Sequence, residues 1–396
     1  MRPASMALAL GCACGPFCSS ARPDAAPADI VVDMPALGVS VPRCMPLPGG
    51  TNGVFTFTPT SEDGWPVIAQ ECTIGPWSAE GARAAFVLPA VLTGHEVSLS
   101  PGSLGDRAPD EFRLEEADNT YLRLFDGDAA VLTYNFAKLL APRVPEQYRR
   151  SSYVHPLYGL DGEVVSDDFP ADHYHHRGLY WAWPFVEIAG KTCDLWMCSG
   201  IEPRFDRWLG REVGPVCAIF GADNGWYVGD REVVDETVWY RVWQADEQGR
   251  AIDVDITWEA LGNPVTLTGA TGKGYGGFCL RFAPRENTAI TTSAGRATED
   301  GLDVPADWAD LSAHLQGARG ISGAAIFVHP GNPGFPNGWL LRHYGFLGCD
   351  WPGLKPGIIE PGKPVHVRYR VYIHRGDADG GKVAEAYRAF RTVADE

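Results

Sequence analysis

Apolar and polar residues alternate over several stretches of this chain, with the period of two that is typical of β-strands. Within Ala251–Glu259, four apolar residues would face one side and four polar residues the other, and Pro364–His374 repeats this pattern. Such alternation predicts a strand with one buried face and one face in contact with solvent. Glu232–Trp243 follows the same pattern less regularly.

Shorter apolar runs, separated by turn residues, occupy the chain from residue 30 to about residue 140. Examples are Gly53–Thr58, Ala84–Leu88, His95–Leu99 and Ala129–Tyr134. This spacing is typical of antiparallel β-structure. We therefore expect an all-β fold, built as one large antiparallel β-sandwich.

The end of the chain changes period. Val383, Tyr387, Phe390 and Ala394 recur at helical spacing, which predicts a short C-terminal amphipathic helix. The sequence has no internal repeat and no clear linker between residues 120 and 396. Residues 30–396 are therefore expected to form a single domain.

The first 29 residues differ from the rest. The apolar, small-residue run Met6–Cys14 resembles an export leader, and an Ala- and Pro-rich linker follows it. Leu10-Gly11-Cys12 loosely resembles a lipoprotein cleavage site. We expect a protein that is exported to the periplasm, the cell surface or the medium, with a lipid anchor as a further option. The alternative is a disordered cytosolic tail.

Composition narrows the classes of partner. The net charge of −17 and the pI near 5.0 disfavour nucleic acids, because an acidic surface repels phosphate. No apolar run approaches the roughly 20 residues of a membrane-spanning helix. Seven cysteines follow the leader without a zinc-type spacing, so most should be buried free thiols. The oligomeric state is not indicated.

The densest group of titratable and aromatic residues is Asp172–Trp183, which holds three of the ten histidines. In an extended segment His173 and His175 would share a face and His176 would lie opposite. An H-x-H pair of this kind can bind a divalent metal ion, so His173 and His175 are candidate ligands. Alternatively, His175 or His176 acts as a general acid or base. The structural alternative is hydrogen-bonded loop packing.

Three neighbours of these histidines are candidates for holding a substrate. Arg177 would clamp an anion or a hydroxyl group, unless it forms a salt bridge to a nearby acid. Trp181 and Trp183 would stack on a sugar ring, unless they belong to the core.

Other candidates lie elsewhere in the chain. His155 precedes Pro156, which indicates a loop or an edge position. His343 and Tyr344 stand together beside small residues, and Lys273 and Tyr275 lie in a glycine-rich stretch that we interpret as a strand with a bulge or tight turn. Carboxylates are plentiful, and the sequence cannot choose a hydrolase pair among them.

Several of these segments resemble the DUF6807 family, whose members are often labelled "methane oxygenase PmoA". They are Tyr153–Gly159, Asp168–Pro170, Asp172–Leu179 and His343–Phe346. The histidine segment is similar to the family motif D-H-x-H-H-R-x-L-W, with Tyr180 standing before Trp181. In the last segment, the family's H-x-x-x-Y-G spacing is shortened. The resemblance covers about residues 30–396.

This resemblance implies a sandwich similar to the galactose-mutarotase-like supersandwich. Proteins of that architecture often act on carbohydrates from a concave sheet. We therefore expect an exported carbohydrate-active enzyme, a lyase, hydrolase or epimerase, with His175 or His176 as acid or base and His155 and His343 as the next candidates. The alternatives are a non-catalytic glycan-binding or scaffold protein and a soluble metal-dependent enzyme. A membrane oxygenase is the least favoured, because the chain lacks a spanning segment.

Overall fold

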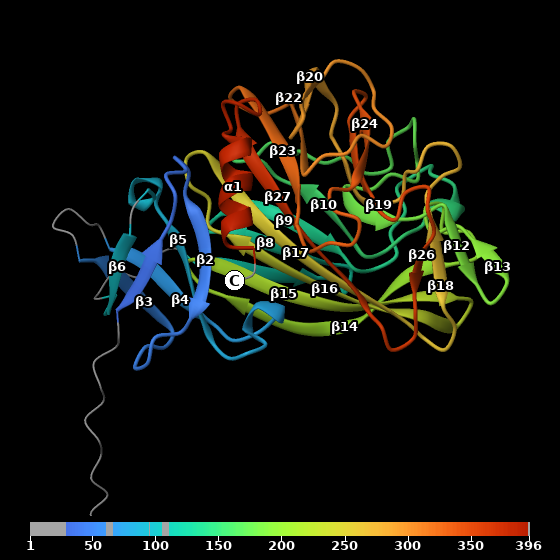
Figure 1. The fold of residues 1–396 in the computed structure, drawn as a ribbon. Helices are drawn as coiled ribbons and strands as arrows, with labels where there is room; N and C mark the ends of the chain where they lie inside the picture. Colours follow the sequence, from blue (N-terminus) through green and yellow to red (C-terminus); the bar gives the residue numbers. More distant parts are fainter. Residues whose placement is uncertain (1–28, 61–65, 95, 105–110, 395–396) are drawn as a thin grey trace, which may run out of the picture.

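The computed structural model describes residues 29–60, 66–94, 96–104 and 111–394. Within these residues the fold is all-β, with antiparallel sheets and a single α-helix near the C-terminus (Figure 1). Both predictions are thereby confirmed. The predicted leader and linker lie, up to residue 28, outside the described residues, and the division at residue 30 stays a prediction. No helix of the described part is long and apolar enough to cross a membrane.

Two large sheets form the sandwich. The nine-stranded sheet has the order β14 (Glu202–Val213), β15 (Cys217–Val228), β16 (Arg231–Trp243), β17 (Gly249–Ala260), β27 (Val365–Arg375), β23 (Ile321–Val328), β22 (Trp308–Leu315), β20 (Arg285–Thr292) and β21 (Gly295–Ala297). The eight-stranded sheet has the order β24 (Gly338–Arg342), β25 (Phe346–Asp350), β19 (Gly277–Arg281), β11 (Leu179–Ala182), β10 (Tyr153–Leu157), β9 (Ala129–Asn135), β8 (Tyr121–Asp126) and β7 (Phe112–Ala117). The main hydrophobic core lies between their inner faces.

Two smaller sheets lie at opposite ends of the sandwich (Figure 1). The N-terminal six-stranded sheet has the order β1 (Ile30–Asp33), β6 (Glu96–Gly102), β3 (Val54–Pro59), β4 (Val67–Cys72), β5 (Arg83–Leu88) and β2 (Val41–Pro46). The four-stranded sheet has the order β13 (Lys191–Cys193), β12 (Phe185–Ile188), β18 (Val265–Thr268) and β26 (Gly357–Ile359). Helix α1 (Val383–Thr392) contacts both β2 and β27, so it joins the N-terminal sheet to the sandwich.

The outer faces of β17 and β27 are less exposed than their alternation predicted. Asp253 and Asp255 are 5% and 4% exposed, and Arg370 is 3% exposed. Helix α1 and the N-terminal sheet cover this side, where Asp253 accepts hydrogen bonds from Arg241 and Arg370 at 3.1 and 2.5 Å. The prediction of solvent-facing polar residues is therefore wrong over much of both strands. A period of two identifies two faces, but it cannot show whether a third layer covers the polar one.

Gln70 on β4 holds the N-terminal sheet against β15. Its Oε1 accepts from the backbone N–H groups of Val216 and Cys217, both at 3.1 Å, and its Nε2 donates to the carbonyl of Cys217 at 3.2 Å. Beside it, the thiols of Cys72 and Cys217 lie 3.6 Å apart. Six of the seven cysteines of the described part are buried, as was predicted for most of them.

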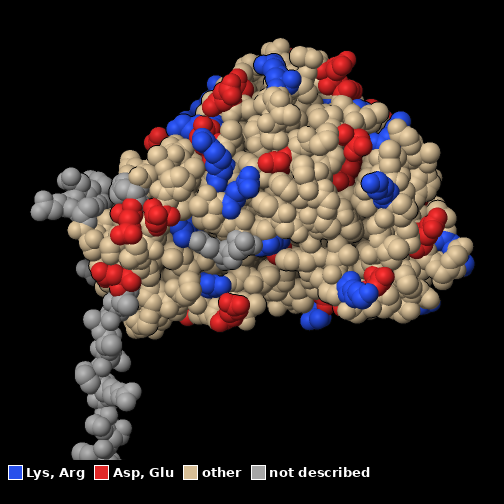
Figure 2. Space-filling view, in the orientation of Figure 1, with Lys and Arg blue, Asp and Glu red and all other residues tan. Residues whose placement is uncertain are grey.

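On the face shown in Figure 2, acidic and basic side chains are interspersed, and neither sign forms a patch of its own.

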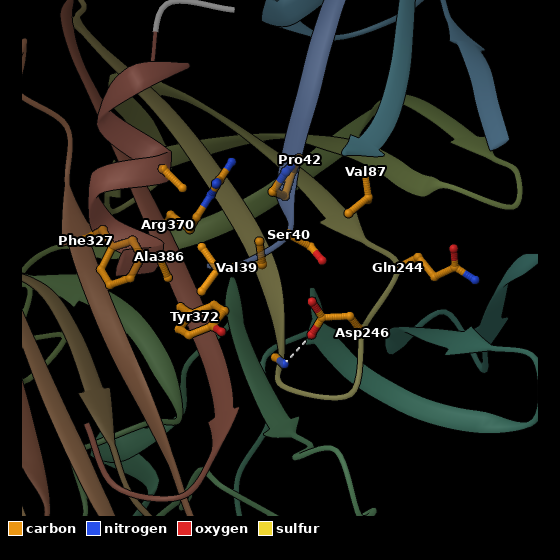
Figure 3. A pocket seen from close by; sticks show the side chains of 13 residues that line it. Val39, Ser40, Pro42, Val87, Gln244, Asp246, Phe327, Arg370, Tyr372 and Ala386 are labelled. Atoms are coloured by element: carbon orange, nitrogen blue, oxygen red, sulfur yellow. Dashed lines mark hydrogen bonds between the residues drawn. The ribbon is translucent and has the colours of Figure 1, made fainter. Parts of the chain in front are cut away.

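A cavity lies between β2, α1 and the turn after β16, and it is lined by Val39, Tyr372 and Asp246, among others (Figure 3). Its volume of about 30 Å³ leaves room for about two water molecules, at roughly 10–15 Å³ each, so it is small for an organic ligand.

Candidate functional site

The histidine segment forms a turn and not an extended strand. The backbone N–H of His173 donates to the carbonyl of Pro170, and that of His176 donates to the carbonyl of His173, both at 2.9 Å. The rings of His173 and His176 consequently stack in parallel, with centroids 4.6 Å apart and planes within 2°. The expectation that these two rings point in opposite directions is therefore wrong, because the hydrogen-bonded turn replaces the alternation of a strand.

The turn between β24 and β25 meets this loop, so two distant sequence motifs converge. Tyr344 stacks on His173 at 5.1 Å and 12°, and Phe346 stacks on His176 at 4.6 Å and 28°. The ring of His175 stands nearly perpendicular to that of His176 at 4.6 Å. We call Asp172, His173, His175, His176 and Tyr344 the histidine cluster.

Arg281, on β19, links the two halves of this cluster. One terminal nitrogen donates to both carboxylate oxygens of Asp172, at 2.9 and 3.0 Å, and the guanidinium lies 4.9 Å from the ring centroid of Tyr344. The same carboxylate lies 3.0 Å from Nδ1 of His173. Sequence reasoning did not assign Arg281 to the site, because only the pairing of β11 with β19 and β25 brings it there.

The histidine cluster is open on one side and closed on the other. The side chains of Asp172 and His173 are 45% and 35% exposed, and Tyr344 is also exposed. His176 is buried, and Trp196 packs against both His175 and His176 with centroids 5.9 Å apart. Trp196 is thus a further residue of the candidate site, and no sequence pattern predicted it.

Burial keeps two of the imidazoles uncharged. Burial, with smaller contributions from the charges of His173 and Arg177, lowers the pKa of His175 to about 4. Burial and, after it, the charge of His175 hold the pKa of His176 well below its ordinary value. At neutral pH both rings are therefore neutral, so each has one nitrogen that can accept a proton.

Several buried polar atoms in and beside the histidine cluster have no hydrogen-bond partner among the described residues. They include Nδ1 of His176, the hydroxyl of Tyr180 and Nη1 of Arg281. Native structures leave few buried polar groups unpaired, and those that remain often mark sites of chemistry or ligand binding. Their concentration here distinguishes the histidine cluster from an ordinary packed loop.

Comparison with known proteins places the chain in a family. The family model described as "Family of unknown function (DUF6807)" matches residues 122–388. The chain belongs to this family. The matched region contains every residue of the histidine cluster, together with Arg281 and Trp196.

The other comparisons add little. No curated protein is similar enough to this chain to count as a match. Among solved structures, the α-galactosidase from Lactobacillus brevis is 7% identical, with a TM-score of 0.34, over 70% of this chain and 42% of that one. The chain thus spans less than half of that protein's length. A similarity at this level carries no argument about fold or activity.

Arg177 of this DUF6807 chain holds the loop instead of facing a ligand. It is 1% exposed, and it donates to the carbonyls of Tyr174 at 2.6 Å, of His176 at 2.9 Å and of Tyr148. Its Nε lies 3.6 Å from the carboxylate of Asp168. This placement corrects the expectation of a substrate clamp, because the guanidinium is buried and most of its donors are occupied.

Trp181 and Trp183 belong to the core. They are 3% and 0% exposed, and their indole N–H groups donate to Glu236 and to the carbonyl of Trp351. We therefore correct the expectation that they stack on a sugar. On β11 the outward residues are Tyr180 and Ala182, which pack with Trp196, whereas Trp181 points into the sandwich.

The remaining candidates are dispersed. His343 points away from Tyr344, since its Nδ1 lies 3.0 Å from Asp300 and its Nε2 3.3 Å from the carbonyl of Ala297. His155 lies on β10, inside the sheet and not at an edge, with Nδ1 3.0 Å from Ser166. Burial and the charge of Arg177 lower its pKa to about 4.

The glycine-rich stretch contributes one residue to the site. It forms strand β19 after a tight turn, as predicted, and Lys273 lies exposed on that turn. The ring of Tyr275 lies 5.0 Å from that of Trp196, so it extends the aromatic patch beside the histidine cluster. In the described part of the chain, no group of three or more His, Cys, Asp or Glu side chains is arranged to hold a metal ion.

The structure also brings two of the many carboxyl groups together on the nine-stranded sheet. Burial, the charge of Asp223 and a hydrogen bond with it raise the pKa of Asp235 to about 6. Carboxyl groups in hydrogen-bond contact are closer than the ~5 Å or more that separates a glycosidase pair. Asp223 and Asp235 therefore do not fit a hydrolase pair.

The raised pKa of Asp235 makes the stability of the protein depend on pH. Because folding raises the pKa of Asp235, its contribution is fully present below about pH 4 and is lost as the pH rises through about 6. Asp235→Asn should therefore raise the thermal unfolding midpoint at pH 8 and leave it nearly unchanged at pH 4. Calorimetry at both pH values measures this, and a lower midpoint at pH 8 would contradict it.

Proposed function

We propose that this protein is an exported carbohydrate-active enzyme that moves a proton with a neutral histidine of the histidine cluster. The observation that carries the proposal is the position of His175. It is a half-buried, uncharged imidazole that lies beside aromatic rings, and the charges of Arg177, Arg150 and Arg281 act on it. A neutral base close to a cation suits proton abstraction, because the cation stabilises the negative charge that develops on the substrate.

Five residues in and beside the histidine cluster have roles in this proposal. His175 accepts the proton, and Nη1 of Arg281 donates a hydrogen bond to a substrate oxygen. The exposed ring of Tyr344 and the neighbouring ring of Tyr275 offer faces on which a sugar can lie. His176 is buried against Phe346, so it positions His175 and does not itself meet the substrate.

The cluster favours lyase or epimerase chemistry over hydrolysis. Hydrolysis of a glycosidic bond ordinarily uses two carboxyl groups, one of which must be free to donate a proton. The carboxylate of the cluster, Asp172, is held by Arg281, and hydrogen bonds to His173 and Arg281 help to lower its pKa against the effect of burial. Abstraction of a proton next to a carboxyl or carbonyl group needs only the histidine and the guanidinium.

Solvent exchange tests the proton step without knowledge of the final product. The protein is incubated in D2O with a panel of neutral and uronate-containing oligosaccharides, and NMR records loss of carbon-bound protons. We expect exchange on one member of the panel, reduced by roughly 10²–10⁴-fold in His175→Gln. His343→Gln is the matched control, since that imidazole faces Asp300 and should leave exchange unchanged.

The pH profile gives an independent measure. Because the pKa of His175 lies near 4, the base is active above that value, and the rate should fall only as the pH drops through about 4. A profile that falls near pH 6.5 would assign the base to another histidine. Saturable sugar binding without any exchange would instead favour a non-catalytic glycan-binding protein, and the absence of both would end the proposal.

A further inference from the structure

A second cavity lies on the opposite side of the sandwich from the histidine cluster. It has a volume of about 250 Å³, and among its lining residues are Trp77, Glu80, Arg83, Asp255, His366 and Arg368. Val254 and Ile256, the neighbours of Asp255 on β17, point into the main core, so Asp255 points outward from the nine-stranded sheet. The histidine cluster lies over the outer face of the eight-stranded sheet, and the core separates the two places.

Two parts of the chain build this cavity. Asp255, His366 and Arg368 come from β17 and β27, at the centre of the nine-stranded sheet. Trp77 belongs to the short helix η1 (Pro76–Ser78), between β4 and β5 of the N-terminal sheet. That half lies outside residues 122–388, the region that matches the family. The cavity is therefore a feature of this chain with its N-terminal sheet, and not of the family region alone.

The floor of the cavity is an aspartate–histidine pair. Nε2 of His366 lies 2.8 Å from Oδ2 of Asp255, whose side chain is 5% exposed, whereas the side chain of His366 is 46% exposed. A carboxylate only accepts hydrogen bonds, so Nε2 carries the hydrogen. In the neutral ring, Nδ1 is then an acceptor, held in a fixed orientation for a donor such as a hydroxyl group.

The walls supply an aromatic ring and balanced charges. The guanidinium of Arg241 lies 4.4 Å from the ring centroid of Trp77, and Nε of Arg83 donates to the Trp77 carbonyl at 3.2 Å. A terminal nitrogen of Arg83 lies 3.9 Å from Glu80, and Arg368 donates to the carbonyl of Ala394 at 3.0 Å. The charged groups therefore already pair with protein groups, which favours a neutral ligand over an anion.

We infer that this cavity is a binding site for the single ring of a neutral sugar. A ring with hydroxyl groups can donate to Nδ1 of His366, accept from Arg83 and lie against Trp77. The volume is slightly below the ~300–1,000 Å³ of drug-sized sites, which suits one ring better than a chain of several. This site does not depend on the proposed reaction at the histidine cluster.

Histidine NMR on the full chain locates the ligand. The protein is labelled at its histidines, and the ring Cε1–H signal of His366 is assigned as the one missing in His366→Gln. Glucose, galactose, mannose and xylose are then titrated separately, with glucuronate and galacturonate as anionic probes. We expect at least one neutral sugar to shift the His366 signal saturably while the His175 signal stays in place.

Variants test the geometry. Saturation-transfer NMR should show that His366→Gln weakens sugar binding on the order of tenfold, as expected for the loss of one hydrogen bond. Trp77→Ala should weaken binding by at least as much. His366 is half exposed, so its variant keeps the test valid if Trp77→Ala fails to fold. His343→Gln is the matched control and should bind normally, since that imidazole faces Asp300 and lines neither place. The inference is overturned if no neutral sugar shifts the His366 signal, if the uronates bind better, or if His366→Gln binds like the wild type.

Discussion

Glu236→Ala should cost at least about 4 kcal/mol of folding free energy, because it removes the acceptor of four buried donors, each worth roughly 1–3 kcal/mol when left unpaired. Glu236 is 1% exposed between the two sheets. Its Oε2 accepts from the indole N–H groups of Trp181, Trp226 and Trp258 at 2.6, 2.9 and 2.8 Å, and its Oε1 accepts from the side chain of Asn224 at 3.0 Å. All four donors belong to buried side chains.

Urea unfolding followed by tryptophan fluorescence measures this loss, since three indoles surround the replaced group. Glu236→Gln keeps one acceptor oxygen and should fall between the wild type and the alanine variant. Glu187→Ala, an exposed position on β12, is the control and should stay within about 0.5 kcal/mol. An alanine variant at position 236 with wild-type stability would show that the indole donors find other partners.

Arg177→Met should destabilise the protein by about 3–5 kcal/mol, as expected when one partner of a buried ion pair is removed. The variant leaves the carboxylate of Asp168 without its cation and three loop carbonyls without their donor. It also removes the guanidinium that lies 3.5 Å from the ring centroid of Phe169. Ligand binding at the histidine cluster should be lost together with stability, because Arg177 holds the loop that carries the histidines.

The pH dependence of the stability of Arg177→Met shows whether the loss comes from the broken ion pair with Asp168. Burial raises the pKa of Asp168 to about 6 despite the opposing charge of Arg177, so the stability that this group contributes is lost as the pH rises through about 6. Without Arg177 the pKa rises further, and the deficit of the variant should grow between pH 6 and pH 8. Arg177→Lys keeps the charge but not the fork of donors and should be intermediate. Lost binding with unchanged stability would instead show that Arg177 contacts the ligand.

The period of two predicted most of the fold, because sheets and their inner faces follow directly from local alternation. It could not predict that α1 and the N-terminal sheet cover Asp253 and Asp255, since that depends on how distant layers pack. The C-terminal helix was predictable because its apolar residues return at a local spacing, and α1 is found at Val383–Thr392.

The candidate site was predictable only in part. The sequence singled out the loop of three histidines and, separately, Tyr344, and the structure brings the two together. The loop's hydrogen-bonded turn reversed the expected ring directions, and the burial of Trp181 followed from the inward face of β11. Strand pairing brings Arg281 to the site, and loop packing brings Trp196 there. No local sequence pattern predicts either contact.

The hydrogen bonds between Gln70 and the start of β15 depend on the amino-acid type on one side only. On one side they need the amide of Gln70, and on the other they use only the backbone groups of Val216 and Cys217. Every residue type except proline offers those backbone groups, so this side tolerates substitution as long as β15 keeps its path. These three hydrogen bonds therefore depend on one glutamine side chain, so a change at position 70 removes all of them, while α1 and the packing of Cys72 against Cys217 still join the sheet to the sandwich.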